Sequence, residues 1–239
     1  MTSHTPIMIH CKSALLFLWV VLCANLIQAA TLNVAAIVEV FSHNEKVNYG
    51  GKPGDMIAGT GMNGNTDDNA PPTALWSWPI THPSTWTVTS NSYKDEWQSG
   101  DLLDSGTSTN SKIGWAIFDL GSAHNLDTFY IWNARENNTR YTKTFNVYIA
   151  SSPTVAPSHG PTNNTSIDYD FSSGGWTLIN TGGSLAGTHQ GNQSLVLQGN
   201  LARYIAVEIL SNNGDGNRVG LAEVGITFIP AKGTLFRID

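Results

Sequence analysis

The sequence predicts an all-β fold, an antiparallel β-sandwich of the jelly-roll kind. Short runs such as Asp127–Asn133 and Lys143–Ser151 place apolar side chains at alternate positions, which is typical of half-buried strands. Segments rich in Gly, Pro, Asn and Ser separate these runs, and no helical period of useful length follows position 30. Short strands with turn signals between them and no helices pack as two facing antiparallel sheets.

The first 30 residues have a different composition and predict a secretory signal peptide. Lys12 is the only Lys or Arg before position 46, and an apolar run and two alanines follow it. The run is shorter than the ~20 residues that a membrane span needs, although an uncleaved anchor is the alternative. We therefore expect a secreted protein, extracellular or periplasmic, with no transmembrane segment after cleavage. Both cysteines, Cys11 and Cys23, lie in this segment, so the mature chain would have no disulfide.

The rest of the chain predicts a single domain over residues 31–229, with a short tail at 230–239. Residues 42–83 are rich in Gly, Asn, Asp and Pro and are expected to be mostly loop. Residues 152–174 predict a second long connection. The expected strands, in order, are Leu32–Phe41, Trp86–Thr89, Gly114–Leu120, Asp127–Asn133, Lys143–Ser151, Gly175–Thr181, Ser194–Leu197, Arg203–Leu210 and Gly220–Ile229.

Charge and composition narrow the class of partner. Removal of 30 residues from 239 leaves 209, and removal of Lys12 leaves 11 basic against 18 acidic residues, a net charge near −7. Nucleic acid is disfavoured, because phosphate binding requires a basic face. Charged residues make up 13% of the chain, against a typical ~25%. A neutral surface with many hydrogen-bonding groups suits an extracellular module.

A polar loop joins the two most regular predicted strands. It holds Arg135, Glu136, Asn137, Asn138 and Arg140 within six positions. Two guanidinium groups, a carboxylate and two amides at one end of a sheet are suited to binding a polyhydroxylated ligand. A solvated hairpin loop is the alternative interpretation of the same residues.

Several landmarks, taken in order, resemble discoidin-like (coagulation factor 5/8 C-type) domains of the galactose-binding-like superfamily, in a secreted bacterial variant. The landmarks are Trp115 with Phe118-Asp119-Leu120-Gly121, the Arg135 loop between its two strands, Trp176, Arg203-Tyr204-Ile205, and the closing Gly220-Leu221-Ala222-Glu223-Val224. The match covers roughly residues 115–228 and is weaker in the N-terminal third.

The resemblance implies a jelly roll that binds carbohydrate through loops at one end. Arg135 and Asn137 match positions that hold sugar hydroxyls in such domains, and an Arg fork pairs well with vicinal oxygens. Glu136 and Asn138 are nearby candidates, while Arg140 is either a ligand contact or a structural residue. Sugars also stack on aromatic rings. The candidates for that role are Trp76, Trp78 and Tyr141.

The resemblance also implies a structural calcium site. Alternating oxygen-bearing side chains in a Gly-rich turn can surround a hard cation, and the family adds a Glu from the closing strand. The expected ligands are Thr60, Asn63, Asn65, Asp67 and Glu223. The Asp that the family usually carries in its N-terminal segment is absent here, and a solvated polar loop is the alternative.

No catalytic pattern supports an enzyme. The chain lacks G-x-S-x-G and H-E-x-x-H motifs, and the five His beyond the signal segment are scattered without the spacing of metal ligands. We therefore expect a secreted, non-catalytic module with a glycan or a cell-surface or matrix component as its partner. An extracellular adhesion or protein-interaction module without sugar specificity is the alternative.

Overall fold

A computed structural model describes most of the region expected to form the domain. The described residues are 35–45, 51–57, 96–99, 112–134, 139–163, 165–185 and 193–230. The chain divides into two units, Met1–Leu32 and Asn33–Asp239. The first unit lies outside the described residues, so the signal peptide stays a prediction. Within the described residues, no helix is long and apolar enough to cross a membrane.

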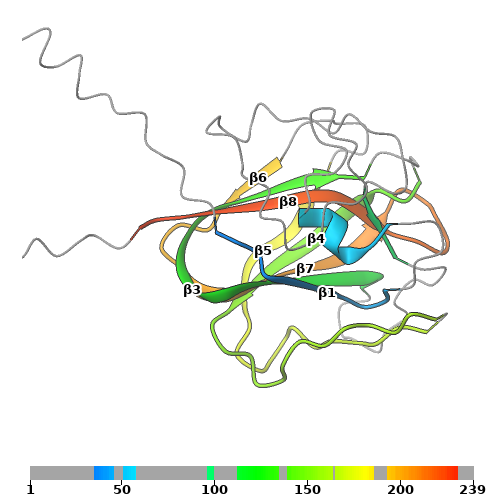
Figure 1. The fold of residues 1–239 in the computed structure, drawn as a ribbon. Helices are drawn as coiled ribbons and strands as arrows, with labels where there is room; N and C mark the ends of the chain where they lie inside the picture. Colours follow the sequence, from blue (N-terminus) through cyan, green and yellow to red (C-terminus); the bar gives the residue numbers. More distant parts are fainter. Residues whose placement is uncertain are drawn as a thin grey trace, which may run out of the picture. The chain divides into compact units, whose positions relative to one another are not determined.

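The fold is built around β3 (Gly114–Asn133), a strand of 20 residues that belongs to two sheets (Figure 1). Its first half pairs with β1 (Glu39–Ser42) on one side and β7 (Leu201–Asn212) on the other. Its second half pairs with β8 (Gly220–Phe228) and β6 (Gln193–Val196). The strand therefore passes from one layer of the sandwich to the other without a loop.

Each sheet extends from its half of β3. The first sheet has the order β1-β3-β7-β4-β5, with β4 at Thr142–Ala150 and β5 at Thr177–Ser184. The second has the order β2-β8-β3-β6, with β2 at Trp97–Gln98. All these strand pairs are antiparallel, and one short 3-10 helix, η1 (Pro53–Ile57), completes the described elements. The predicted antiparallel β-sandwich is confirmed.

The main core lies between the two sheets and follows from the alternation in the strands. Phe118 and Phe129, from the two halves of β3, are fully buried in it, and their ring centroids are 6.2 Å apart. Val147 of β4, Val207 of β7 and Ile226 of β8 are also fully buried in this core. Burial of such side chains is the main stabilising contribution, about 1.5–3 kcal/mol for each.

A prediction that was wrong concerns the boundary inside β3. The sequence indicated two strands, Gly114–Leu120 and Asp127–Asn133, because the residues between them are polar. The structure has one strand, with a register shift between Asp119 and His124. Gly121 adopts a positive φ of 72° there, which favours glycine. Backbone pairing with β7 continues past the shift, so the polar stretch bends and does not end the strand.

The long connection between β4 and β5 forms a second core on the outer face of the first sheet. Tyr169 and Phe171 of this connection pack with Trp115 and Tyr148 of the sheet. The rings of Tyr148 and Phe171 are stacked, with centroids 5.3 Å apart. The buried ammonium group of Lys112 donates a hydrogen bond to the carbonyl of Tyr169 at 2.9 Å and forms an ion pair with Asp168.

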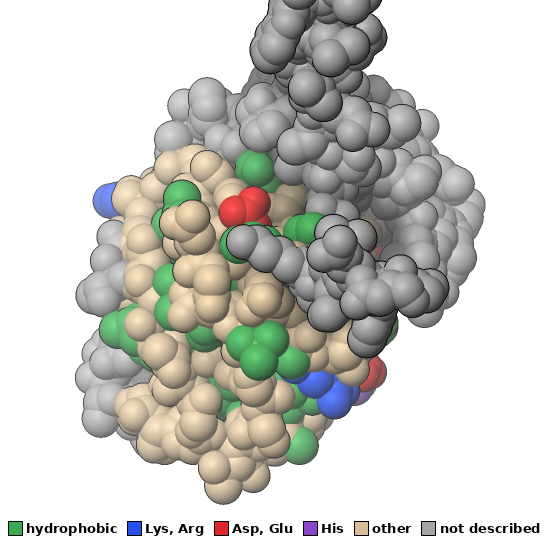
Figure 2. Space-filling view, turned by 90° about the vertical axis from the view of Figure 1, so that its left-hand side faces the viewer, with side chains coloured by type: hydrophobic (Ala, Val, Ile, Leu, Met, Phe, Trp, Pro, Cys, Tyr) green, Lys and Arg blue, Asp and Glu red, His purple; other side chains and the backbone are tan. Residues whose placement is uncertain are grey.

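Figure 2 views the molecule from the side on which β3 bends. Hydrophobic side chains form separate patches there, among a surface that is mostly uncharged. The large hydrophobic side chains that are exposed in the described part of the chain are Val38, Val155, Leu178, Val196, Leu201 and Ile229. On the described part of this face, the low proportion of charged residues in the sequence appears as few charged side chains.

Candidate functional site

Three segments meet at one end of the sandwich, which we call the loop end. They are the connection from β3 to β4 (134–141), the connection from β7 to β8 (213–219), and residues 96–99, which include β2. The first of these contains the polar loop that the sequence indicated as a ligand site. Residues 135–138 lie outside the described part of the chain, whereas the residues on both sides of them are placed.

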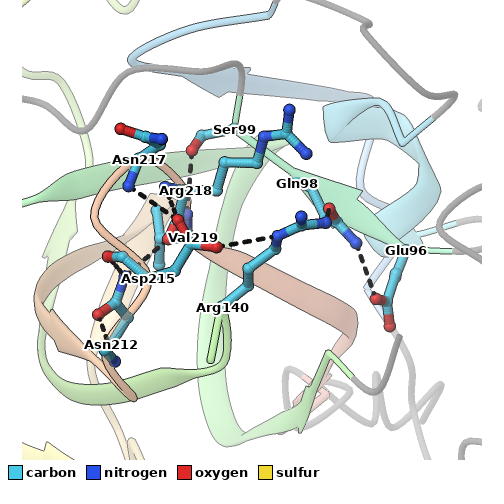
Figure 3. A network of polar contacts seen from close by, with 10 residues as sticks. Glu96, Gln98, Ser99, Arg140, Asn212, Asp215, Asn217, Arg218 and Val219 are labelled. Carbon is cyan, nitrogen blue, oxygen red and sulfur yellow. Dashed lines mark hydrogen bonds and ion pairs between the residues drawn. The ribbon is translucent and has the colours of Figure 1, made fainter. Parts of the chain in front are cut away.

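Arg140 holds the loop end together (Figure 3). Its Nε donates to Oδ2 of Asp215 at 3.1 Å, and its Nη1 donates to Oε1 of Gln98 at 2.8 Å. Gln98 in turn donates from Nε2 to Glu96 at 3.1 Å. One guanidinium group therefore links all three segments. Its planar fork of donors allows this, since a Lys ammonium group has no fixed pair of directions.

The connection between β7 and β8 is folded around Asp215. One carboxylate oxygen accepts hydrogen bonds from the amides of Asn217 and Arg218, at 2.8 and 2.9 Å. Asn212 donates from Nδ2 to the carbonyls of Asp215 and Arg218, at 2.8 and 2.7 Å. Asn and Asp favour such turns because their side chains bond to nearby backbone groups. Gly214 takes a φ of 112°, which residues with a Cβ rarely adopt.

The environment of Asp215 favours its charged form. Partial burial by itself raises its pKa, but the amide of Asn217, the guanidinium of Arg140 and the amide of Arg218 together lower the pKa below its ordinary value of 3.8. Hydrogen bonds to a carboxylate stabilise the ionised state. The side chains of Arg140 and Asp215 are only 18% and 15% exposed, so the pair is shielded from solvent.

Backbone hydrogen bonds fix the positions of the same segments. The amide of Asp215 donates to the carbonyl of Thr139 at 3.1 Å, and the amide of Gly220 donates to the carbonyl of Arg140 at 3.0 Å. Ser99 and Val219 exchange two hydrogen bonds, at 2.9 and 3.1 Å. The three segments of the loop end are therefore joined by backbone hydrogen bonds as well as by side chains.

The predicted ligand-binding residues divide into described and undescribed groups. Arg140 belongs to the network through its bonds to Asp215 and Gln98, and its ligand role stays a prediction. Tyr141 is buried, with 6% of its surface exposed, so as placed it offers little open face for stacking. Its ligand role stays a prediction. Outside the described residues lie Arg135, Glu136, Asn137, Asn138, Trp76 and Trp78.

The predicted calcium ligands are similarly divided. Glu223 lies in β8, opposite Trp132 of β3, and is fully buried. Thr60, Asn63, Asn65 and Asp67 fall outside the described residues. Within the part of the chain that is described, no group of three His, Cys, Asp or Glu residues is placed to hold a metal ion.

Sequence reasoning missed Gln98 and Asp215. Gln98 carries no local signal, since its partner Arg140 lies 42 positions away. Asp215 does have a local sequence signal. It lies in a run that is dense in turn-forming residues, Asn212-Asn213-Gly214-Asp215-Gly216-Asn217. Such a run between two strands indicates a structured loop.

No family model matches this chain, and no curated protein matches it. Among solved structures, it is similar to the CBM32 of AlyQ in complex with 4,5-unsaturated mannuronic acid, with 16% identity and a TM-score of 0.46 over 81% of this chain and 96% of that one. It is also similar to a fucose binding module of Streptococcus pneumoniae, with 17% identity and a TM-score of 0.46 over 84% and 99% of the two chains.

A third similar structure is CpGH89CBM32-5 of Clostridium perfringens in complex with GalNAc-beta-1,3-galactose. It has 11% identity and a TM-score of 0.45, over 79% of this chain and 93% of that one. Similarity at this level does not assign a ligand to this chain.

Proposed function

We propose that this chain is a secreted, non-catalytic carbohydrate-binding module whose ligand site is at the loop end. The observation that carries the proposal is the pair of hydrogen bonds by which Arg140 joins Asp215 and Gln98. They bring together three segments, one of which includes in its sequence the polar residues 135–138. The discoidin-like landmarks of the sequence support carbohydrate as the class of ligand.

The proposed mechanism is equilibrium capture without a chemical step. Arg135 and Asn137 supply hydrogen bonds to sugar hydroxyls, and an aromatic ring among Trp76, Trp78 and Tyr141 packs against the apolar face of the sugar. The network of Arg140 holds the ends of the loop in place, which reduces the entropy lost on binding. A single shallow site of this kind binds weakly, with about 4–8 kcal/mol of free energy.

Glycan-array screening followed by titration calorimetry tests the proposal. We expect Arg135→Ala and Asn137→Ala each to abolish measurable binding of the glycan that the array identifies. Lys143→Ala, which removes an exposed cation outside the network, is the matched control and should bind as the native chain does. Full binding by Arg135→Ala would remove the loop end from consideration. A chain that is silent on glycans but captured in a protein complex would favour an adhesion or interaction module.

We also propose that a calcium ion, if bound, has a structural role. Glu223 has no exposed surface, so a cation that it holds would be enclosed by the fold. Thermal melting in calcium and in a chelator tests this. A rise in melting temperature with calcium that Glu223→Gln removes would support the site. Equal melting temperatures in both conditions would exclude it.

A further inference from the structure

The connection between β4 and β5 is fastened along β1 and the residues that follow it. The amide of Ile167 donates to the carbonyl of His43 at 3.0 Å. Asn44 donates from Nδ2 to the carbonyl of Asn163 at 2.8 Å, and the amide of Glu45 donates to the carbonyl of Pro161 at 2.9 Å. The described residues 157–163 and 165–167 thus form an attached strip at the edge of the first sheet, which we call the edge strip.

His159 makes the charged contacts between the edge strip and β1. Its Nδ1 is 2.8 Å from Oε1 of Glu45, and its Nε2 is 2.9 Å from Oε1 of Glu39. Glu39 and Glu45 precede and follow Phe41 in the sequence, and the ring centroid of Phe41 is 4.8 Å from that of His159. One imidazole therefore contacts both the first residue of β1 and a residue that follows the strand. Its side chain is 51% exposed, so protons from solvent can reach it.

The protonation state of His159 follows from these two contacts. An ionised carboxylate only accepts hydrogen bonds, and a neutral imidazole has one N–H and one lone pair. Both contacts can be hydrogen bonds only when both ring nitrogens carry protons. In the neutral ring, one nitrogen lone pair would face a carboxylate oxygen at less than 3 Å.

We propose that His159 is a pH-dependent clasp that holds the edge strip on β1 when it is protonated and loosens it when it is neutral. This is a regulatory property of the fold and goes beyond carbohydrate binding. It stands on the position of one imidazole, from the edge strip, between two carboxylates of β1 and the residues that follow it. It does not depend on which ligand the loop end binds.

The neighbouring charges favour the protonated ring. Glu39 pairs with Asp119 across the sheet, and Asp119 lies opposite Tyr204. The nearby cation Arg203 is bound to Asp119, which compensates part of its charge. Partial burial by itself lowers the pKa of His159, but its hydrogen bonds to Glu45 and then Glu39 outweigh this and raise the net pKa above 6.5.

The direction of the pH effect follows from this shift. A group whose pKa is raised in the folded state contributes its full stabilisation below the pKa of the unfolded chain, which is about 6.5 for His. That contribution is lost as the pH rises through the higher folded pKa. We therefore expect a tight edge strip in mildly acidic solution and a looser one in alkaline solution.

Hydrogen exchange of the edge strip, read by mass spectrometry at about pH 5.5 and about pH 8.5, tests the clasp. After correction for intrinsic rates, we expect the protection of the edge strip in the native chain to be lower at about pH 8.5 than at about pH 5.5. The expected decrease is by a factor of about two to ten. His159→Arg carries a permanent charge and should stay protected at both values. His159→Asn is neutral and should have low protection at both.

Two further measurements exclude other causes. His124→Asn, which changes a His outside the edge strip, should keep the pH response of the native chain. An NMR titration should give His159 a pKa above that of His in an unfolded peptide, and Glu45→Gln should lower it. Equal protection of the native chain and His159→Asn at both pH values would overturn the proposal. So would a titration of His159 at or below the value in the unfolded peptide.

Discussion

Asp119 and Arg203 form a two-pronged ion pair across β3 and β7. Nε and Nη2 of Arg203 donate to the two carboxylate oxygens of Asp119, each at 2.7 Å. The amide of Gly121 donates to the same carboxylate at 2.7 Å. The pair lies where β3 begins to shift register, and it joins two sequence landmarks that are 84 positions apart. This ion pair anchors the bend of the longest strand.

Substitutions at this pair should have unequal effects. Asp119 is buried and Arg203 is 40% exposed, so Arg203→Ala leaves a buried carboxylate without its cation. Asp119→Ala leaves an Arg that water can solvate. We expect the urea midpoint to fall further for Arg203→Ala than for Asp119→Ala, and the double variant to lose less stability than the two losses added together. Additive losses in a double-mutant cycle would show that the two side chains are not coupled.

Acid should weaken the loop end through Asp215. The pKa of this carboxyl is lowered in the folded chain, so its contribution is present above the ordinary pKa of 3.8 and is lost as the pH falls through the lower folded value. We expect Asp215→Asn to reduce the free energy of unfolding by about 1–3 kcal/mol at neutral pH. The difference from the native chain should shrink below about pH 4. A difference that stays constant down to the lowest pH would contradict this origin.

A methyl group at position 160 should disturb the contact of the edge strip with β1. A Cβ on Gly160 would lie 2.4 Å from the carbonyl oxygen of Ser42 and 2.7 Å from the amide nitrogen of Asn44. Backbone atoms cannot yield as a flexible side chain does, so Gly160→Ala should cost about 2–3 kcal/mol in chemical denaturation. Gly216→Ala is the matched control, because no atom lies within 4 Å of its added Cβ. It should change stability by less than about 0.5 kcal/mol.

The buried cation of the second core offers a further test. The ammonium group of Lys112 is paired with Asp168 and lies 5.9 Å from the centroid of Phe171. Lys112→Ala removes both the ion pair and the packing, and we expect a loss of about 3 kcal/mol. Lys112→Met keeps the apolar stem, so its loss should be smaller, about 1 kcal/mol. Equal losses in thermal melts of the two variants would assign the whole effect to the charge.

The strands were predictable where alternation was strong. The sequence predicted Lys143–Ser151 and Gly220–Ile229, and the structure has Thr142–Ala150 and Gly220–Phe228. Trp115 and Trp132, which lie on two of the predicted strands, are both fully buried. A local periodic pattern carries this information because each strand must present one face to the interior.

Contacts between distant residues were not predictable. His159 was one of five scattered His, and its partners Glu45 and Glu39 are 114 and 120 positions away. The contacts of Arg140 with Asp215 and Gln98 could likewise not be inferred from its neighbours in the chain, because these partners lie 75 and 42 positions away. Such contacts are set by strand order and register, which the side-chain pattern of a single strand does not encode.

The passage of β3 through both layers has a mechanical consequence. A force applied to either sheet reaches the other along covalent backbone, without a connecting loop that could stretch. Sliding of the layers past one another would have to break the pairing of β3 with β7 or with β8.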